Sequence, residues 1–237
     1  MSKTSVYIAS FDIGKKNFAF VIQELDKKFL SALGNIPKIE RYNKDGTCTP
    51  KFKKILDIVH NHGKIVLIRN LDLTKNCNKK AYLDPKVFVN MIDVLDEYKA
   101  YWECVEVFLI EQQMNFGKKK RNPMAQKLGQ HCYSYFVFNY RDFKKIIDFP
   151  SYHKTQILGA PKKFGLITKE YKNGKKRDIK DNRKKWSCRV VGDILQRRGD
   201  SESFGVWSDT KKQDDISDCV LMINAFAYMK YIDKCRF

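Results

Sequence analysis

Long apolar runs, cysteine motifs and glycine clusters are all missing from this chain of 237 residues. No stretch approaches 18 consecutive apolar residues, which excludes a membrane-spanning helix. The seven cysteines are odd in number and form no Cys-x-x-Cys pair, so we expect free thiols in a reducing compartment rather than disulfides or zinc. The 12 glycines form no phosphate-binding loop, which argues against an ATP-dependent kinase.

The chain has far fewer acidic residues than basic ones. The chain has 46 Lys and Arg against 27 Asp and Glu, a formal net charge of +19. Residues 151–190 hold 13 of the bases and only three acids. Within them, residues 172–185 carry eight bases and few apolar side chains, which predicts a mobile loop leading into a basic helix. Such a balance favours a polyanionic partner.

Length and composition predict one domain. At 43% hydrophobic residues, 237 residues can bury a sizeable core. We expect a single domain over residues 1–237, with an insertion or elaboration at residues 26–61. Apolar strand residues begin at Val6, which leaves no room for a presequence. The expected location is therefore cytoplasmic or nuclear, not secreted, and the host cytoplasm if the source is a virus.

Hydrophobic periodicity predicts alternating strands and helices. Apolar side chains fill both alternating sets of residues 6–13, which indicates a buried strand, and Gly14 allows a turn into a second strand at residues 17–22. The later elements are expected, in chain order, as a strand at 64–71, a helix at 84–103, a strand at 105–112, a helix at 123–140, a strand at 145–149, and helices at 181–198 and 214–232. This order predicts an α/β fold with a mixed five-stranded sheet flanked by helices.

Carboxylates end three apolar segments of this basic chain. Asp12 and Glu111 each close a strand, and Asp215 and Asp218 lie on one face of the first turn of the last helix. Each acid alone is explained by a turn, a solvated strand end, or the helix macrodipole. Together, in a protein that attracts anionic polymers, they predict a metal site acting on phosphodiesters.

The motifs around these acids resemble those of the RuvC-like Holliday junction resolvases of the ribonuclease H-like superfamily, most closely the poxvirus type. They are Asp-Ile-Gly-x-x-Asn from Asp12, Ile-Glu-Gln-Gln around Glu111, and Lys-Lys-x-Asp-Asp-x-x-Asp ending at Asp218. The resemblance implies a ribonuclease H-like fold and a homodimer that nicks four-way DNA junctions symmetrically. It also implies that Asp12, Glu111, Asp215 and Asp218 bind two Mg²⁺ ions, with Mn²⁺ as a substitute. Asp214 remains a capping or supporting candidate, and an alternative third ligand.

Basic residues near these acids are the expected DNA contacts. Lys118, Lys119, Lys120 and Arg121 follow Glu111 directly, and Phe116 is placed either to stack on bases or in the core. The resemblance also implies functionally important lysines ahead of the last helix, and their nearest matches here are Lys154 and Lys184 or Lys185. The remaining expected contacts are Lys154, Lys175, Lys176, Arg177, Lys184 and Lys185.

The resulting interpretation is a Mg²⁺-dependent endodeoxyribonuclease that resolves Holliday junctions in recombination and repair by two-metal-ion hydrolysis. The main alternative is another ribonuclease H-like nuclease, acting on RNA/DNA hybrid or branched DNA. An actin-like kinase shares the Asp-x-Gly-x-x-Asn motif but needs further glycine-rich loops. A non-catalytic junction-binding module with structural acids is a third possibility.

Overall fold

A computed structural model describes residues 4–78, 84–113, 123–170 and 176–237, and the side chains of residues 169–180 are not described. Its main sheet has five strands in the order β3-β2-β1-β4-β5. The strands are β1 (Ser5–Asp12), β2 (Phe18–Asp26), β3 (Lys64–Leu71), β4 (Val107–Gln112) and β5 (Lys145–Pro150). β2 is antiparallel to β1 and β3, whereas β4 is parallel to β1 and β5. The predicted mixed five-stranded sheet is confirmed.

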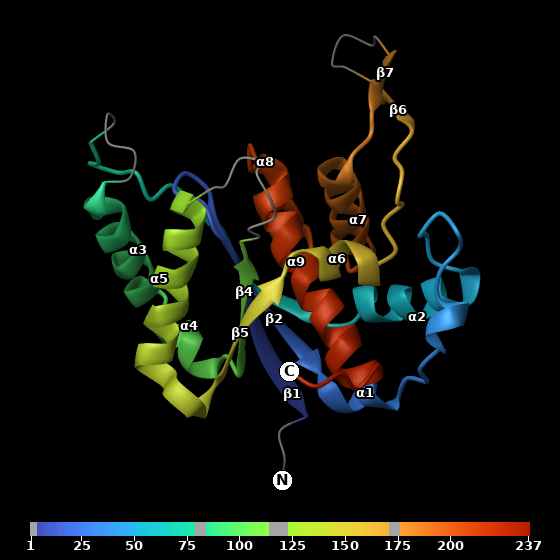
Figure 1. The fold of residues 1–237 in the computed structure, drawn as a ribbon, viewed down its shortest axis with the longest axis horizontal. Helices are drawn as coiled ribbons and strands as arrows, with labels where there is room; N and C mark the ends of the chain where they lie inside the picture. Colours follow the sequence, from blue (N-terminus) through green and yellow to red (C-terminus); the bar gives the residue numbers. More distant parts are fainter. Residues whose placement is uncertain (1–3, 79–83, 114–122, 171–175) are drawn as a thin grey trace.

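Helices cover both faces of this sheet (Figure 1). One face carries α3 (Pro85–Glu97), α4 (Lys99–Cys104) and α5 (Pro123–Tyr140), and a 3₁₀ turn at Arg141–Phe143 leads from α5 into β5. The other face carries α9, whose neighbours include α6 and α7. The elements of that side are α1 (Lys27–Ala32), α2 (Pro50–Asn61), α6 (Tyr152–Ile157), α7 (Arg183–Arg197), α8 (Ser201–Asp209) and α9 (Gln213–Ala227), which continues into a π-helical turn at Tyr228–Ile232.

Strict alternation along β1 produces two separate cores. Val6 and Ile8 belong to the core beneath α9, whereas Ala9, Phe11 and Ile13 belong to the core beneath α3, α4 and α5. Because successive side chains of a strand point to opposite faces, Ser10 and Asp12 fall on the α9 face. The two-sided apolar pattern of residues 6–13 thus reflects a strand buried on both faces.

The segment at residues 26–61, which the sequence predicts to be an insertion or elaboration, packs against the end of the last helix. It contains α1, a 3₁₀ turn at Lys38–Glu40 and α2. Buried Arg41 lies over the rings of Phe52 and Tyr228 and donates hydrogen bonds to both carboxylate oxygens of Asp233, at 3.0 and 2.6 Å. This ion pair ties the elaboration to the segment that follows α9.

Several elements differ from the sequence-based expectation. The helix expected over residues 84–103 is divided at Tyr98 into α3 and α4, because the backbone there leaves the helical region at ψ 15°. The composition of residues 172–185 predicts a loop, but strands β6 (Leu166–Glu170) and β7 (Lys176–Lys180) pair as an antiparallel hairpin. The predicted loop was wrong for residues 176–180, whereas the basic helix predicted to follow it is confirmed as α7. Residues 172–175 lie outside the described residues. The hairpin projects from the body of the molecule (Figure 1). α6 and α8 were not predicted.

The described residues contain neither a disulfide nor a helix that could span a membrane. Within the four described ranges, no helix combines the length and apolar character needed to cross a bilayer. All seven cysteines lie at described positions and none is paired with another.

Candidate metal centre

Two of the predicted carboxylates lie side by side at the carboxyl ends of parallel strands. Phe11 of β1 pairs with Ile110 of β4, so that Asp12 and Glu111 come next on the two neighbouring strands. Both project to the α9 face, since Val107 and Leu109 precede Glu111 at alternate positions of that core. The carboxyl ends of strands are where α/β sheets place their ligands.

Helix α9 brings the third carboxylate to the same place. The Ser10 hydroxyl donates to the carbonyl of Cys219 at 2.8 Å, and the Cys219 thiol donates to the carbonyl of Ala19 at 3.5 Å. These bonds fix the first turns of α9 against β1 and β2, next to Asp218. One carboxylate oxygen each from Asp12, Glu111 and Asp218 lies within 4.8 Å of the others.

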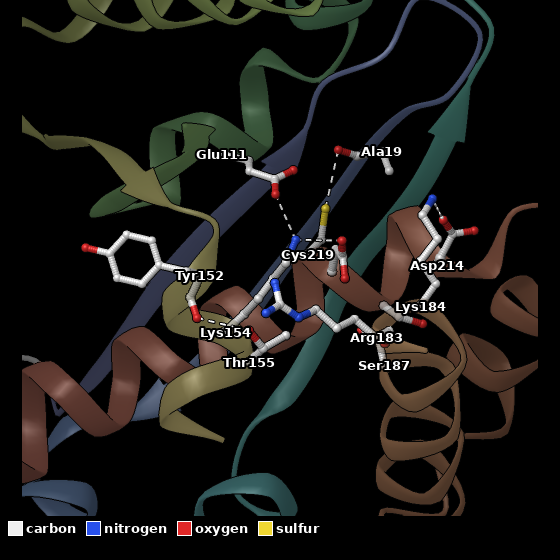
Figure 2. Close-up of polar contacts among 12 residues, drawn as sticks. Ala19, Glu111, Tyr152, Lys154, Thr155, Arg183, Lys184, Ser187, Asp214 and Cys219 are labelled. Atoms are coloured by element: carbon white, nitrogen blue, oxygen red, sulfur yellow. Dashed lines mark hydrogen bonds and ion pairs between the residues drawn. The ribbon is translucent and has the colours of Figure 1, made fainter. Parts of the chain in front are cut away.

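A lysine lies between these carboxylates. Lys154 of α6 donates from Nζ to Glu111 Oε1 at 2.8 Å and to Asp218 Oδ2 at 2.6 Å, and its side chain is only 7% exposed. Figure 2 shows the lysine reaching from α6 to Glu111. Lys154 was predicted as a DNA contact, but the structure places its ammonium inside the acidic cluster.

Burial and mutual contact shift the pKa values of the residues in this cluster. Burial raises the pKa of Asp12 well above its usual value, and the neighbouring Glu111 raises it further. Burial also raises the pKa of Asp218, although Lys154 opposes the shift. Burial alone would lower the pKa of Lys154, but Glu111 and Asp218 raise it beyond the ordinary lysine value. The lysine therefore stays charged and partly compensates three crowded acids.

The two remaining acids of the last motif lie beside the cluster without joining it. Asp215 is buried, and burial followed by the charge of Asp214 raises its pKa. Its Oδ2 makes no hydrogen bond and lies 3.8 Å from the ammonium of Lys212. The Asp214 carboxylate accepts a hydrogen bond from Lys184 of α7, to one side of Lys154 (Figure 2).

The other predicted DNA contacts divide into two groups. Lys176 and Arg177 lie on β7, and Lys184 and Lys185 lie in the first turn of α7. The structure therefore places these four on the hairpin and on the helix adjoining the cluster. The others lie outside the described residues: Phe116, Lys118, Lys119, Lys120, Arg121 and Lys175.

The donor set suits a hard divalent cation. Carboxylate oxygens are the ligands that Mg²⁺ prefers, and three of them converge here. The buried Oδ2 of Asp215, one turn away on the same helix, is a fourth oxygen that accepts no hydrogen bond and lies 3.8 Å from the Lys212 ammonium. Asp12, Glu111, Asp218 and Asp215 thus fit a magnesium site in kind and in charge.

Sequence reasoning missed what holds α9 in place. Ser10 is a polar residue on an otherwise apolar face of β1, and its hydroxyl bonds the α9 backbone. That interruption of the apolar pattern was the available signal. The position of Lys154 had no comparable signal, because α6 is short and its place depends on packing between distant segments.

Comparisons with known proteins identify viral relatives of unknown function. The chain is 32% identical over 237 residues to uncharacterized protein 170L of Invertebrate iridescent virus 6, covering 97% of this chain and 92% of that protein. It is 28% identical to uncharacterized protein 97L of Invertebrate iridescent virus 3, covering 94% of this chain and all of that protein. No protein-family model matches the chain.

A solved structure shares the fold of this chain. The yeast mitochondrial Holliday junction resolvase Ydc2 aligns with a TM-score of 0.51 at 13% identity, over 94% of this chain and 78% of that one. The fowlpox virus resolvase in complex with Holliday junction DNA aligns at 0.45 and 19% identity, over 95% and 97%. The likeness to the yeast structure, together with the sheet order, confirms the predicted ribonuclease H-like α/β fold.

Proposed function

The chain belongs to the family of protein 170L of Invertebrate iridescent virus 6, and we propose that it is a Mg²⁺-dependent endonuclease that resolves four-way DNA junctions. The observation that carries the proposal is the group of three carboxylates at the ends of β1, β4 and the first turns of α9. A site this acidic in a chain of net charge +19 fits a metal-assisted reaction on nucleic acid.

Asp12, Glu111 and Asp218 would hold the metal, with Asp215 as a further ligand. When bound, two such ions activate a water and stabilise the leaving oxygen of a phosphodiester. The protein itself holds the carboxylates in position. β1 and β4 set the spacing of Asp12 and Glu111, and the Ser10 bond to α9 sets Asp218 against them.

Lys154 compensates the carboxylates before metal and substrate arrive. Its ammonium bonds Glu111 and Asp218, and three half-buried acids without it would repel one another. In the loaded site the same ammonium would face a phosphate oxygen of the substrate. This role agrees with the resemblance, which places lysines of functional importance ahead of the last helix.

Basic segments would hold the DNA on either side of the site. The hairpin strand β7 carries Lys176, Arg177 and Lys180, and α7 begins with Arg183, Lys184 and Lys185. A homodimer would place two such sites on one junction, as symmetric nicking requires. Each phosphate neutralised adds affinity that falls as salt rises.

The deciding experiment is incubation with a labelled four-way junction. We expect symmetric nicks in Mg²⁺ or Mn²⁺, none in EDTA, and binding without cleavage in Ca²⁺, whose larger and more flexible oxygen shell fits in-line attack poorly. Asp142→Asn, an exposed acid far from the site in sequence, serves as the control variant. Plain duplex and RNA/DNA hybrid are incubated in parallel.

The outcomes separate the candidate functions. Cleavage of hybrid but not of junction would replace the proposal with a ribonuclease. Binding without Mg²⁺-stimulated cleavage would indicate a junction-binding module, and equal rates in Ca²⁺ and Mg²⁺ would contradict a tuned two-metal site.

A further inference from the structure

A groove of about 1020 Å³ adjoins the carboxylates on the side away from α9. Its walls are the ends of β4 and β5 and one face of α5, which lie beside one another in Figure 1. Glu111 is part of its lining, so the groove and the proposed metal site share a wall. A molecule bound in the groove would therefore touch the cleavage site.

Half of the described lining residues of the groove carry uncharged hydrogen-bonding groups. They are the amides of Gln112, Gln113, Gln126 and Gln130 and the phenols of Tyr133 and Tyr152. The charged residues of the described lining are Lys127, Glu111 and Asp148.

Two amides are placed to act together. Gln126 and Gln130 lie four residues apart on α5 and hence on one face of the helix. Between them, Gly129 leaves the floor of the groove open, because among the described residues a Cβ there would meet only the Gln113 side chain, at 3.9 Å. Gln112 donates to Asp148 at 3.0 Å, and exposed Gln130 donates to the Ser134 hydroxyl at 3.3 Å, which leaves the Gln130 amide oxygen available. No hydrogen bond of the Gln126 or Gln113 side chain is seen within the described ranges.

We infer that this groove receives an unpaired nucleobase of the cleaved strand, next to the phosphate held at the carboxylates. A glutamine amide offers a donor and an acceptor side by side, which matches the edge of a base, and a tyrosine ring offers a stacking surface. Gln126 and Gln130 would contact the edge and Tyr133 the face. The inference rests on the proposed function, since the base belongs to its substrate.

The first test fills the groove without changing charge. Junctions carrying the fluorescent base 2-aminopurine at each position beside the branch point are bound in EDTA to wild type and to Gly129→Leu. We expect wild type to change the fluorescence at one position, and Gly129→Leu to lose that change while still binding the junction. Gly205→Leu on α8 is the matched control and should behave as wild type. An unchanged signal in a folded Gly129→Leu protein would overturn the inference.

The second test measures base preference in Mg²⁺ on junctions that vary only at the position identified by fluorescence. The double variant Gln126→Ala, Gln130→Ala should lose discrimination between bases by about 5-fold or more, which is the lower end of what a good side-chain contact to a base supplies. Gln196→Ala, exposed on α7, is the control. An unaltered preference would contradict the inference. If no junction is cleaved, the proposed function fails, while the fluorescence test still decides whether the groove binds a base.

Discussion

The two faces of the central sheet are built from different side chains. Beneath α3, α4 and α5 the core is aromatic, with Phe11, Phe108 and Phe136 in mutual contact at centroid distances of 4.1 to 6.5 Å. Beneath α9 the core is largely aliphatic, and polar groups penetrate it, including Ser10 and Lys154. All three clustered carboxylates lie on this second face.

The aromatic face stabilises the sheet, whereas the α9 face carries the proposed metal ligands. Large rings that interlock bury much apolar area in a fixed arrangement, which gives the sheet a rigid support. The opposite face can then carry buried charges that cost free energy to keep together. Since β1 and β4 belong to both cores, a rigid aromatic face holds Asp12 and Glu111 at a constant spacing.

The sharpest test of this separation concerns the acids. Asp12→Asn, Glu111→Gln and Asp218→Asn should each lower cleavage by at least about 1,000-fold, equivalent to ~4 kcal/mol, because each removes a metal ligand. Junction binding should stay intact or tighten, since less negative charge then faces the phosphates. Asp214→Asn, whose carboxylate pairs with Lys184, should cost far less. Single-turnover cleavage with binding measured in Ca²⁺ distinguishes the two effects, and wild-type rates in any of the first three would remove that residue from the site.

The opposite effect is expected on the aromatic face. Phe136→Ala should destabilise the fold by about 3 to 5 kcal/mol, because a fully buried ring leaves a cavity between Phe11 and Phe108. Cleavage measured well below the unfolding midpoint should stay close to wild type. Urea unfolding gives the comparison with Phe138→Ala, whose ring is 79% exposed and should change stability by less than about 0.5 kcal/mol. A stable Phe136→Ala protein without activity would contradict the division of roles.

The basic hairpin should affect affinity alone. Replacing Lys176 and Arg177 with Ala should reduce the slope of log K against log salt by roughly 0.9 for each phosphate that is no longer neutralised, for junction and duplex alike. Alanine at Lys54 and Lys64, which are both exposed, gives a control with the same change in net charge. If the hairpin variant unfolds or keeps the wild-type slope, β7 is a structural or dimerisation element.

The smallest expected effect is on the pH dependence of the free energy of unfolding in the metal-free protein. The pKa of Asp12 is raised in the folded state, so folding favours its protonated form, and stability is lost as pH rises from the ordinary aspartate range through the raised pKa. Asp12→Asn abolishes this loss. In EDTA the variant should melt higher than wild type at neutral pH, by about 2 to 4 °C for each kcal/mol, with the gain shrinking toward pH ~4. A gain that persists in the ordinary aspartate range would indicate another cause.

The local hydrophobic pattern of the sequence predicted most strands of the sheet but few of the contacts around the carboxylates. The alternation of residues 6–13 and the apolar run ending at Glu111 predicted β1 and β4 with their acids, because burial on two faces leaves a direct mark on the sequence. The composition of residues 172–185 predicted a loop, because a segment with so few apolar residues gives no sign that β7 pairs with β6. Lys154 was recognised as important but assigned to DNA, because its partners are 43 and 64 residues away.

The hydrogen bond from Ser10 to Cys219 joins residues 209 positions apart, and this has a consequence in time. At about 5 to 20 residues per second, roughly 10 to 40 seconds of synthesis separate the first strand from the helix that completes the acidic cluster. A nascent or truncated chain that lacks α9 has Asp12 and Glu111 but not Asp218. Under the proposed function, an incomplete product would therefore carry the basic residues of β7 and α7 without the complete set of metal ligands.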